Sequence, residues 1–371
     1  MLPWLIIGLA TIVAAILSYR LLKLIIRRPS LHLPPGPRPW PVVGNLPHIG
    51  PLLHRALAVL ARTYGPLMYL RLGFVDVVVA ASASVAEQFL KVHDANFSSR
   101  PLNSMTTYMT YNQKDLAFAP YGPRWRFLRK ISSVHMFSVK ALDDFRQLRQ
   151  DMFTAGTDTS SSTIEWAIAE LIRNPRVMVR VQQEMDIVVG RDRRVTELDL
   201  PQLPYLQAVV KETFRLHPPT PLSLPRVATE SCEIFDYHIP KGTTLLVNIW
   251  AIGRDPNEWI DPLEFKPERF LLGGEKAGVD VMGTNFEVIP FGAGRRICVG
   301  MGLGLKVVQL LTATLAHTFV WELENGLDPK NLNMDEAHGF ILQREMPLFV
   351  HPYPRLSRHV YSSSSSPSSS S

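Results

Sequence analysis

A glycine-rich loop that presents one cysteine constrains this chain more than any other stretch. Residues 291–300 read Phe-Gly-Ala-Gly-Arg-Arg-Ile-Cys-Val-Gly and directly precede a long apolar segment that predicts a helix. The glycines at 292, 294 and 300 permit positive φ angles, so the backbone can pass close to a flat ligand and donate amide N–H groups to sulfur. The positive end of the following helix favours the thiolate of Cys298. We therefore expect a metal ligand at Cys298, although a single cysteine in an apolar stretch is more often a small buried hydrophobe.

Composition limits the class of protein. With 371 residues, of which 46% are hydrophobic and 19% charged, the chain can bury a large core. Its two cysteines are far apart and form no disulfide framework, which suits a reducing compartment, and we expect Cys232 to be filler in the core or at the surface. The net charge of +6 suits nucleic acid, an anionic membrane or an acidic protein, but without a basic repeat or a base-stacking platform we expect no nucleic acid.

The N-terminal region has the pattern of a membrane anchor. Residues 2–19 are apolar, carry no charged side chain and are long enough to span a bilayer as a helix. Basic residues follow, so the positive-inside rule places the rest of the chain in the cytosol, and a cleaved signal peptide is disfavoured because its basic n-region is absent. We expect four regions: an anchor with its basic flank (1–28), a proline-rich hinge (29–47), a globular domain (48–360) and a disordered Ser-rich tail (361–371).

Hydrophobic periodicity and turn residues predict the elements of the globular domain. Strands over 67–71 and 75–80 form a hairpin around Gly73, and Ser84 with Glu87 forms a capping box for a helix that runs to about residue 93. A helix starts at Pro123, because proline favours the first helical turn. Further predicted elements are helices over 52–64, 204–217 and 301–320 and a hairpin tip over 339–342.

Two spaced pairs and one short stretch suggest functional residues, each weakly by itself. Trp125 and Arg129 lie four apart on one helix face, and Glu212 and Arg215 lie three apart, a spacing that usually marks a solvated surface bridge. The stretch 155–159, Ala-Gly-Thr-Asp-Thr, is poor helix-forming sequence inside a helix. There Thr159 can divert its hydroxyl to the backbone and open a bulge for water, although an ordinary kink would have the same sequence.

Taken together in order, these patterns resemble one known family. The pattern Phe-x-x-Gly-x-Arg-x-Cys-x-Gly, filled by Phe291, Gly294, Arg296, Cys298 and Gly300, is similar to the haem-binding signature of the cytochrome P450 superfamily of haem-thiolate monooxygenases. The resemblance implies a mainly α fold with a small β region. It also implies haem b with Cys298 as the axial thiolate.

The resemblance assigns roles to the other residues. It implies that Asp158 and Thr159 form an acid–alcohol pair that delivers protons during oxygen activation. It also implies a haem-carboxylate clamp of Trp125, Arg129, Arg226 and Arg296, and a buried ion network of Glu212, Arg215 and Arg269. A basic docking face for an acidic reductase would comprise Arg124, Arg126, Lys130 and Arg295, with a merely solvated charged face as the equal alternative.

A narrower resemblance covers most of the chain. Residues 155–173, 195–256 and 273–352 are similar to the plant flavonoid 3′-hydroxylases of that superfamily. This implies insertion of one oxygen atom from O₂ into the flavonoid B ring, with naringenin as a representative substrate. Electrons would come from NADPH through a separate membrane-bound flavoprotein reductase, with the chain anchored once in the endoplasmic reticulum membrane and its catalytic domain in the cytosol.

The chain departs from the family after Gln150. Family members place five helices, on the order of 100 residues, between the helix of Trp125 and the helix of Asp158, and here they are missing. No Gly or Pro occurs over residues 124–155, so we expect one continuous or barely bent helix across Gln150 and Asp151. A second interpretation therefore stays open: an impaired or inactive, truncated haem-binding membrane protein.

Overall fold

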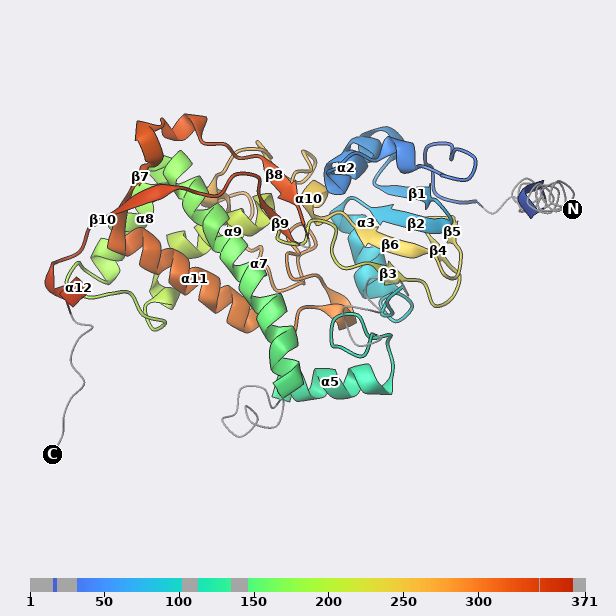
Figure 1. The fold of residues 1–371 in the computed structure, drawn as a ribbon, viewed down its shortest axis with the longest axis horizontal. Coiled ribbons are helices and arrows are strands. Elements are labelled where there is room, and N and C mark those ends of the chain that lie inside the picture. Colours follow the sequence, from blue (N-terminus) through green and yellow to red (C-terminus); the bar gives the residue numbers. More distant parts are fainter. Residues whose placement is uncertain (1–15, 19–31, 102–112, 135–145, 340, 363–371) are drawn as a thin grey trace, which may run out of the picture.

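The computed structural model describes residues 16–18, 32–101, 113–134, 146–339 and 341–362. A small β region with its covering helices lies at one end of the chain's described part, and long helices α7, α8, α9 and α11 make up the other (Figure 1). The mainly α fold with a small β region is as predicted.

The main sheet has the order β1-β2-β6-β3. Strands β1 (Leu67–Leu72) and β2 (Val75–Ala80) form the predicted antiparallel hairpin, with Leu67 opposite Ala80 and a positive φ of 61° at Gly73 in the turn. Strand β6 (Thr244–Val247) runs parallel to β2, and β3 (Arg226–Val227) pairs antiparallel with β6. This pairing places Arg226, a predicted site residue, at the edge of the main sheet.

Side chains alternate across this sheet and join two separate cores. Val77 and Val79 pack with Leu57 of α2 (Leu53–Tyr64). Val78 and Ala80 pack on the other face, against α3 (Ala83–Glu87) and the π-helical segment η2 (Gln88–Val92). The η2 segment lies against the cysteine loop, so this packing positions one wall of the candidate site.

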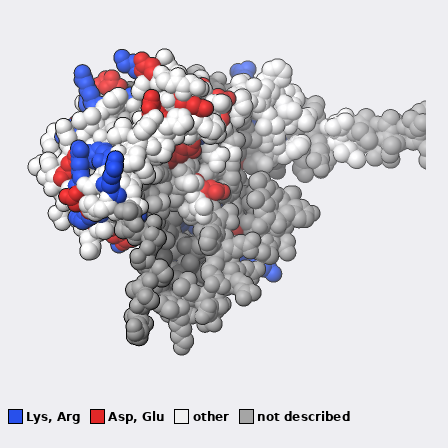
Figure 2. All heavy atoms as spheres, turned by 60° about the vertical axis from the view of Figure 1, so that its left-hand side comes forward, with Lys and Arg blue, Asp and Glu red and all other residues white. Residues whose placement is uncertain are grey.

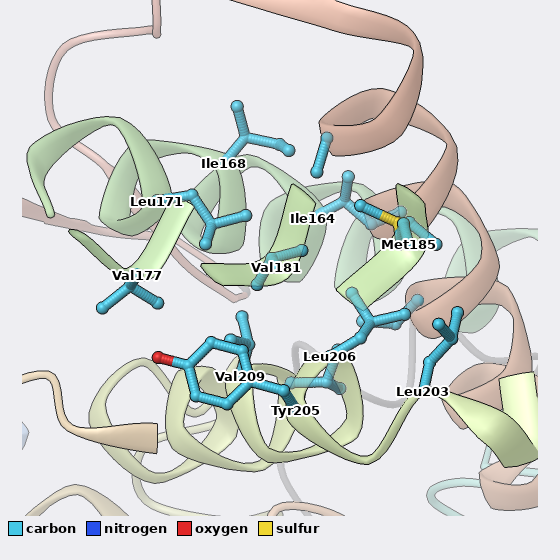
Figure 3. Packing of buried hydrophobic residues seen from close by; sticks show 14 of the residues in the cluster. Ile164, Ile168, Leu171, Val177, Val181, Met185, Leu203, Tyr205, Leu206 and Val209 are labelled. Carbon is cyan, nitrogen blue, oxygen red and sulfur yellow. The ribbon is translucent and has the colours of Figure 1, made fainter. Parts of the chain in front are cut away.

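The largest core joins the long helices. Apolar residues of α7 (Arg146–Arg173), α8 (Pro175–Val188), α9 (Pro204–Leu216) and α11 (Met301–Thr318) interdigitate (Figure 3). Leu171, Val181, Leu206 and Val209 are fully buried at its centre. At roughly 1.5–3 kcal/mol per buried aliphatic side chain, this cluster is a main source of stability and fixes α7 and α9 relative to α11.

The remaining described elements are short apart from α5 (Pro123–Val134), which carries Trp125 and Arg129. Three two-stranded sheets pair β4 (Cys232–Ile234) with β5 (Tyr237–Ile239), β7 (Phe319–Leu323) with β10 (Val350–Pro354), and β8 (Glu336–His338) with β9 (Leu342–Arg344). The short helices are η1 (Leu46–His48), η3 (Leu200–Gln202), α10 (Ile249–Ile252), η4 (Pro267–Phe270), η5 (Gly294–Arg296), η6 (Glu324–Gly326), η7 (Pro329–Asn331) and α12 (His359–Ser362).

Charge is mixed on the surface near α8 and α12. Figure 2, which brings the left-hand side of Figure 1 forward, shows Lys and Arg intermixed with Asp and Glu over the described part of that face. Ion pairs such as Arg191 with Asp186 account for some of this mixing.

The junction predicted at Gln150 and Asp151 lies inside one helix. α7 runs from Arg146 to Arg173 without interruption, and only residues 135–145 separate it from α5. Eleven residues cannot form five helices, so the central helices between the Trp125 helix and the Asp158 helix are missing from this chain.

Two local predictions were wrong. Ser82, not Ser84, caps α3, since its hydroxyl accepts the Val85 amide. The helix after the cysteine ends at Thr318 because Phe319 and Val320 instead pair with β10.

The predicted anchor and tail lie almost entirely outside the described residues. Only residues 16–18 of the anchor and 361–362 of the tail are described. Over the described ranges, no helix combines the length and apolar character needed to cross a membrane.

Candidate functional site

The cysteine loop is a compact turn that a backbone hydrogen bond closes just before a helix. Cys298 N donates to Phe291 O at 2.9 Å, and Gly300 forms the N-cap of α11. Gly292 and Gly294 have φ angles of 71° and 68°, as predicted, whereas Gly300 has φ −88°, so the prediction of positive φ there was wrong. Gly300 sits at a helix start, where a right-handed conformation continues into the first turn.

Close approach explains why residue 294 is glycine. A Cβ there would lie 2.1 Å from Leu90 O, so only glycine lets the loop rest against the end of η2. A Cβ at Gly292 would reach 4.0 Å from Arg226 Nη2. The loop therefore lies directly against the segments that carry its charged neighbours.

Phe291 anchors the other side of the loop. Its ring meets Phe214 of α9 edge-on with centroids 5.2 Å apart, and a Cβ at Gly304 of α11 would lie 3.7 Å from it. The start of the loop is thus held between two helices of the main core, which sets where Cys298 emerges.

The Cys298 side chain is solvent-accessible but surrounded by protein. Burial raises the pKa of its thiol, while a hydrogen bond from the Gly300 amide and the charge of Arg129 lower it. Burial prevails, so the pKa of the free thiol lies above its ordinary value. The amide and the guanidinium are nonetheless placed to stabilise a thiolate once a cation binds the sulfur.

Buried guanidinium groups lie beside the loop. Arg226 Nη2 donates to Ala293 O at 2.9 Å, and Arg296 donates to Ser98 O and Ala119 O, both at 2.6 Å. Among the described residues, Arg226 Nε and Nη1 and Arg296 Nη1 are buried without a hydrogen-bond partner. Buried unpaired donors of a charged group are costly, so these atoms mark a place for an anionic ligand.

Electrostatics supports the same conclusion. Arg100, Arg129, Arg226 and Arg296 interact with one another or with Cys298, and within the described residues Asp94 and Asp115 offset part of their charge. Desolvation lowers the pKa of Arg226 to about 10. For Arg296, desolvation together with the Arg226 charge lowers the pKa to about 10. A haem with its two carboxylates fits the excess positive charge, the unpaired donors and the cysteine.

The side chains of Trp125 and Arg129 both donate hydrogen bonds to backbone carbonyls of the protein. Trp125 Nε1 donates to Leu116 O at 3.0 Å, and its ring lies beneath Arg296, whose guanidinium carbon is 4.3 Å from the ring centroid. Arg129 Nη1 donates to Ile297 O at 2.6 Å, next to Cys298. A direct bond from the Trp125 indole to a haem carboxylate would therefore replace its bond to Leu116.

Asp158 and Thr159 lie on α7, which packs against α11. Asp158 is exposed and Thr159 is half-buried. The Thr159 carbonyl accepts the Thr163 hydroxyl at 2.7 Å, and α7 stays α-helical throughout, so the bulge predicted at Thr159 is absent from this structure.

Glu212, Arg215 and Arg269 come together in a buried network. Arg215 binds both Glu212 oxygens at 2.7 Å, and Arg269 Nε lies 3.0 Å from Glu212 Oε1. Arg215 also donates to the carbonyls of Gly253, Pro262 and Glu264. All three side chains are nearly inaccessible to solvent, so this is no surface bridge but a junction between α9 and the segment of η4.

The basic face has mixed character. Arg124, Arg126, Lys130 and Arg295 are exposed, but Arg295 Nε lies 3.3 Å from Asp94 Oδ2. Cys232 is half-buried on β4, as expected of filler.

Sequence reasoning missed Asp94 and Arg100. Arg100 donates to Ala117 O, Leu224 O and Pro225 O. It thereby fixes the two residues that directly precede Arg226. Neither residue has a local signal, since Asp94 meets Arg295 across 201 positions of sequence.

Comparison with known proteins adds the family relationship. The family model described as Cytochrome P450 matches residues 34–150 and 141–350. The chain is 47% identical to a flavonoid 3′-monooxygenase of Arabidopsis thaliana, over 95% of this chain and 99% of the relative, and 48% identical to one of Petunia hybrida, over 90% and 94%. A solved structure of a zebrafish cytochrome P450 with progesterone aligns with TM-score 0.69 and 23% identity, over 81% of this chain and 99% of that one.

The comparisons also support the conclusion that a central segment is missing from this chain. The Arabidopsis alignment spans 508 positions against 371 residues here, so at least 137 positions have no counterpart in this chain. The two family matches meet around residues 141–150, next to the predicted junction.

Proposed function

This chain belongs to the cytochrome P450 family, and from that premise we propose that it hydroxylates flavonoids at the 3′ position of the B ring. It is a haem-thiolate monooxygenase, and its family holds haem b through a cysteine thiolate and receives electrons from a separate reductase. The single observation that carries the substrate class is the identity of nearly half of all aligned residues with flavonoid 3′-monooxygenases over almost the whole chain.

The residues of the site divide the work of binding. Cys298 would bind the haem iron through its sulfur, and the unpaired donors of Arg226 and Arg296 would hold the haem carboxylates. Phe291 and Gly294 fix the loop so that the sulfur emerges at one point. Bound haem supplies O₂ activation, which uses two NADPH-derived electrons and two protons to yield one hydroxyl group and one water.

Proton delivery would fall to α7. Asp158 is exposed and so can exchange protons with solvent, and Thr159, the next residue, is half-buried. We assign Asp158 as the proton source and the Thr159 hydroxyl as the group that passes protons inward. Arg129 beside Cys298 would favour the thiolate throughout.

One structural fact favours the second candidate function, a haem-binding protein with impaired turnover. Only residues 135–145 connect α5 to α7, so the chain has little material with which to cover the site. A site open to water binds substrate without a fixed geometry and loses reduced oxygen to side reactions.

Turnover separates the two functions. Membranes carrying the full chain and a flavoprotein reductase are supplied with naringenin and NADPH, with Cys298→Ala as the inactive control. A product with one added oxygen on the B ring supports the proposal, and two added oxygens would assign 3′,5′ specificity instead. Bound haem with NADPH oxidation but no hydroxylated product supports the impaired form.

Membrane attachment is a separate proposal that rests on the apolar residues 2–19 and their basic flank. We propose a single-pass anchor in the endoplasmic reticulum membrane with the catalytic domain in the cytosol. Sedimentation with microsomes after carbonate washing, compared with a chain lacking residues 1–28, tests it. Equal release of both chains would contradict it.

A further inference from the structure

Asp94 directs both carboxylate oxygens at the cysteine loop. The residue lies just after η2 (Gln88–Val92), and its side chain is 14% exposed. The Arg295 amide donates to Asp94 Oδ1 at 2.9 Å, and Arg295 Nε lies 3.3 Å from Oδ2. One carboxylate thus holds both the backbone and the side chain of a residue three positions before Cys298.

The contact is close because no side chain separates the two segments. A Cβ at Gly294 would lie 2.7 Å from Asp94 Oδ1 and 2.1 Å from Leu90 O. The peptide that precedes Arg295 is therefore pressed against the turn that follows η2. A displacement of Asp94 must move the loop with it, since this interface has no flexible spacer.

Asp94 also faces Arg226. Arg226 Nη1 lies 3.9 Å from Asp94 Oδ1, which is too long for a hydrogen bond but close enough for strong attraction. The same Nη1 and the neighbouring Nε are buried and have no hydrogen-bond partner among the described residues. Asp94 therefore balances the charge of Arg226 without occupying the donors that an anionic ligand needs.

We propose that Asp94 is a positioning residue for the haem site, with two separable tasks. Its oxygen fixes the Arg295 peptide and thereby the loop of Cys298, and its charge holds Arg226 in the direction of the haem carboxylates. This inference rests on the proposed haem function. Because the carboxylate charge lies between the loop and Arg226, its removal shifts the reduction potential of the bound iron to more positive values.

Two variants separate the tasks in the full chain. Asp94→Asn keeps an oxygen that accepts the Arg295 amide but loses the charge, and Asp94→Ala loses both. Glu87→Gln is the matched control, since Glu87 is a half-buried carboxylate just before η2 whose ion-pair partner within the described residues is the exposed Lys91. The readouts are amide hydrogen exchange in the peptide containing Arg295, the potential of the iron, and the rate of haem transfer to an excess of apomyoglobin.

We expect Asp94→Ala to speed exchange at Arg295 about tenfold, as loss of one hydrogen bond to a charged group allows, and to speed haem transfer. Asp94→Asn should leave exchange near the wild-type rate and still shift the potential positively. Glu87→Gln should change neither. Wild-type exchange in Asp94→Ala, or an unshifted potential in haem-loaded Asp94→Asn, would overturn the inference.

The outcomes also distinguish this inference from the proposed function. A wild-type chain that takes up no haem contradicts the proposed function. Hydrogen exchange still tests the hold of Asp94 on the loop in that protein. If Asp94→Ala does not fold, the reduction potential of the iron in Asp94→Asn still tests whether the charge of Asp94 acts on the haem site.

Discussion

His217 stacks on Trp166 with ring centroids 4.0 Å apart and planes 5° from parallel, and so joins the end of α9 to α7. Its Nε2 lies 2.8 Å from Glu170 Oε1. Burial lowers the pKa of His217, against the hydrogen bond and charge of Glu170, which raise it. The contact requires a proton on Nε2, because the carboxylate can only accept. This agrees with the absence of a hydrogen-bond partner for Nδ1 among the described residues.

Replacing His217 tests that contact. His217→Phe keeps a stacking ring, but among the described residues it leaves the Glu170 carboxylate with a hydrogen bond from Asn174 alone, so we expect the free energy of unfolding to fall by about 1–3 kcal/mol. Urea unfolding followed by circular dichroism measures the change. Glu170→Gln, which retains hydrogen-bonding capacity, should cost less. Equal stability of His217→Phe and the wild type would show that the bond contributes nothing.

For the buried network around Glu212 we expect a larger loss of stability. Glu212→Gln leaves Arg215 and Arg269 without their shared counter-charge, so the free energy of unfolding should fall by about 3–5 kcal/mol. The control is Glu233→Gln, whose partner His238 lies at the surface, with an expected change within about 0.5 kcal/mol. Similar losses in the two variants would mean that burial of the network adds no stability.

Glu336 predicts how stability depends on pH. Burial raises its pKa, but hydrogen bonds from His54 and Trp250 and the charges of Arg254 and Arg55 outweigh burial and hold the pKa at about 2, below the ordinary 4.5. The carboxylate therefore stabilises the fold fully above about pH 4.5, and this stability is lost as the pH falls toward 2.

A pH series tests this. Between about pH 6 and pH 3 the wild type should lose about 2 kcal/mol more than Glu336→Gln does, because glutamine does not titrate. Urea midpoints at matched ionic strength measure the difference. Parallel losses in both proteins would assign the acid sensitivity to other groups.

The two cysteines give a spectroscopic prediction. Cys298→Ala should abolish the thiolate-type spectrum of the reduced, CO-bound protein, whereas Cys232→Ala should keep it, since Cys232 lies half-buried on β4. Absorbance difference spectra of both variants provide the measurement. Survival of the spectrum in Cys298→Ala would mean that another side chain binds the iron.

Local sequence was sufficient wherever neighbouring residues decide the conformation. The apolar spacing over 204–217 predicted α9, which spans Pro204–Leu216, and the lack of Gly or Pro over 124–155 predicted a helix through Gln150 and Asp151. The prediction failed at Thr159, where a poor helix-forming stretch stays α-helical. Residues 156–158 are exposed there, and the α7 residues buried in the main core begin at Ile164, so the helix continues through a stretch that makes no core contacts of its own.

The chain's own sequence determined the family, the helix that crosses the junction and the loop that presents Cys298, because each depends on residue order within a short segment. Only the tertiary structure decided which atoms those residues bind. Trp125 donates to Leu116 O, Arg226 to Ala293 O, and Asp94 accepts the Arg295 amide across 201 positions. Hydrogen bonds need partners within about 3 Å. Residues that lie far apart in the sequence come that close only through the packing of whole elements.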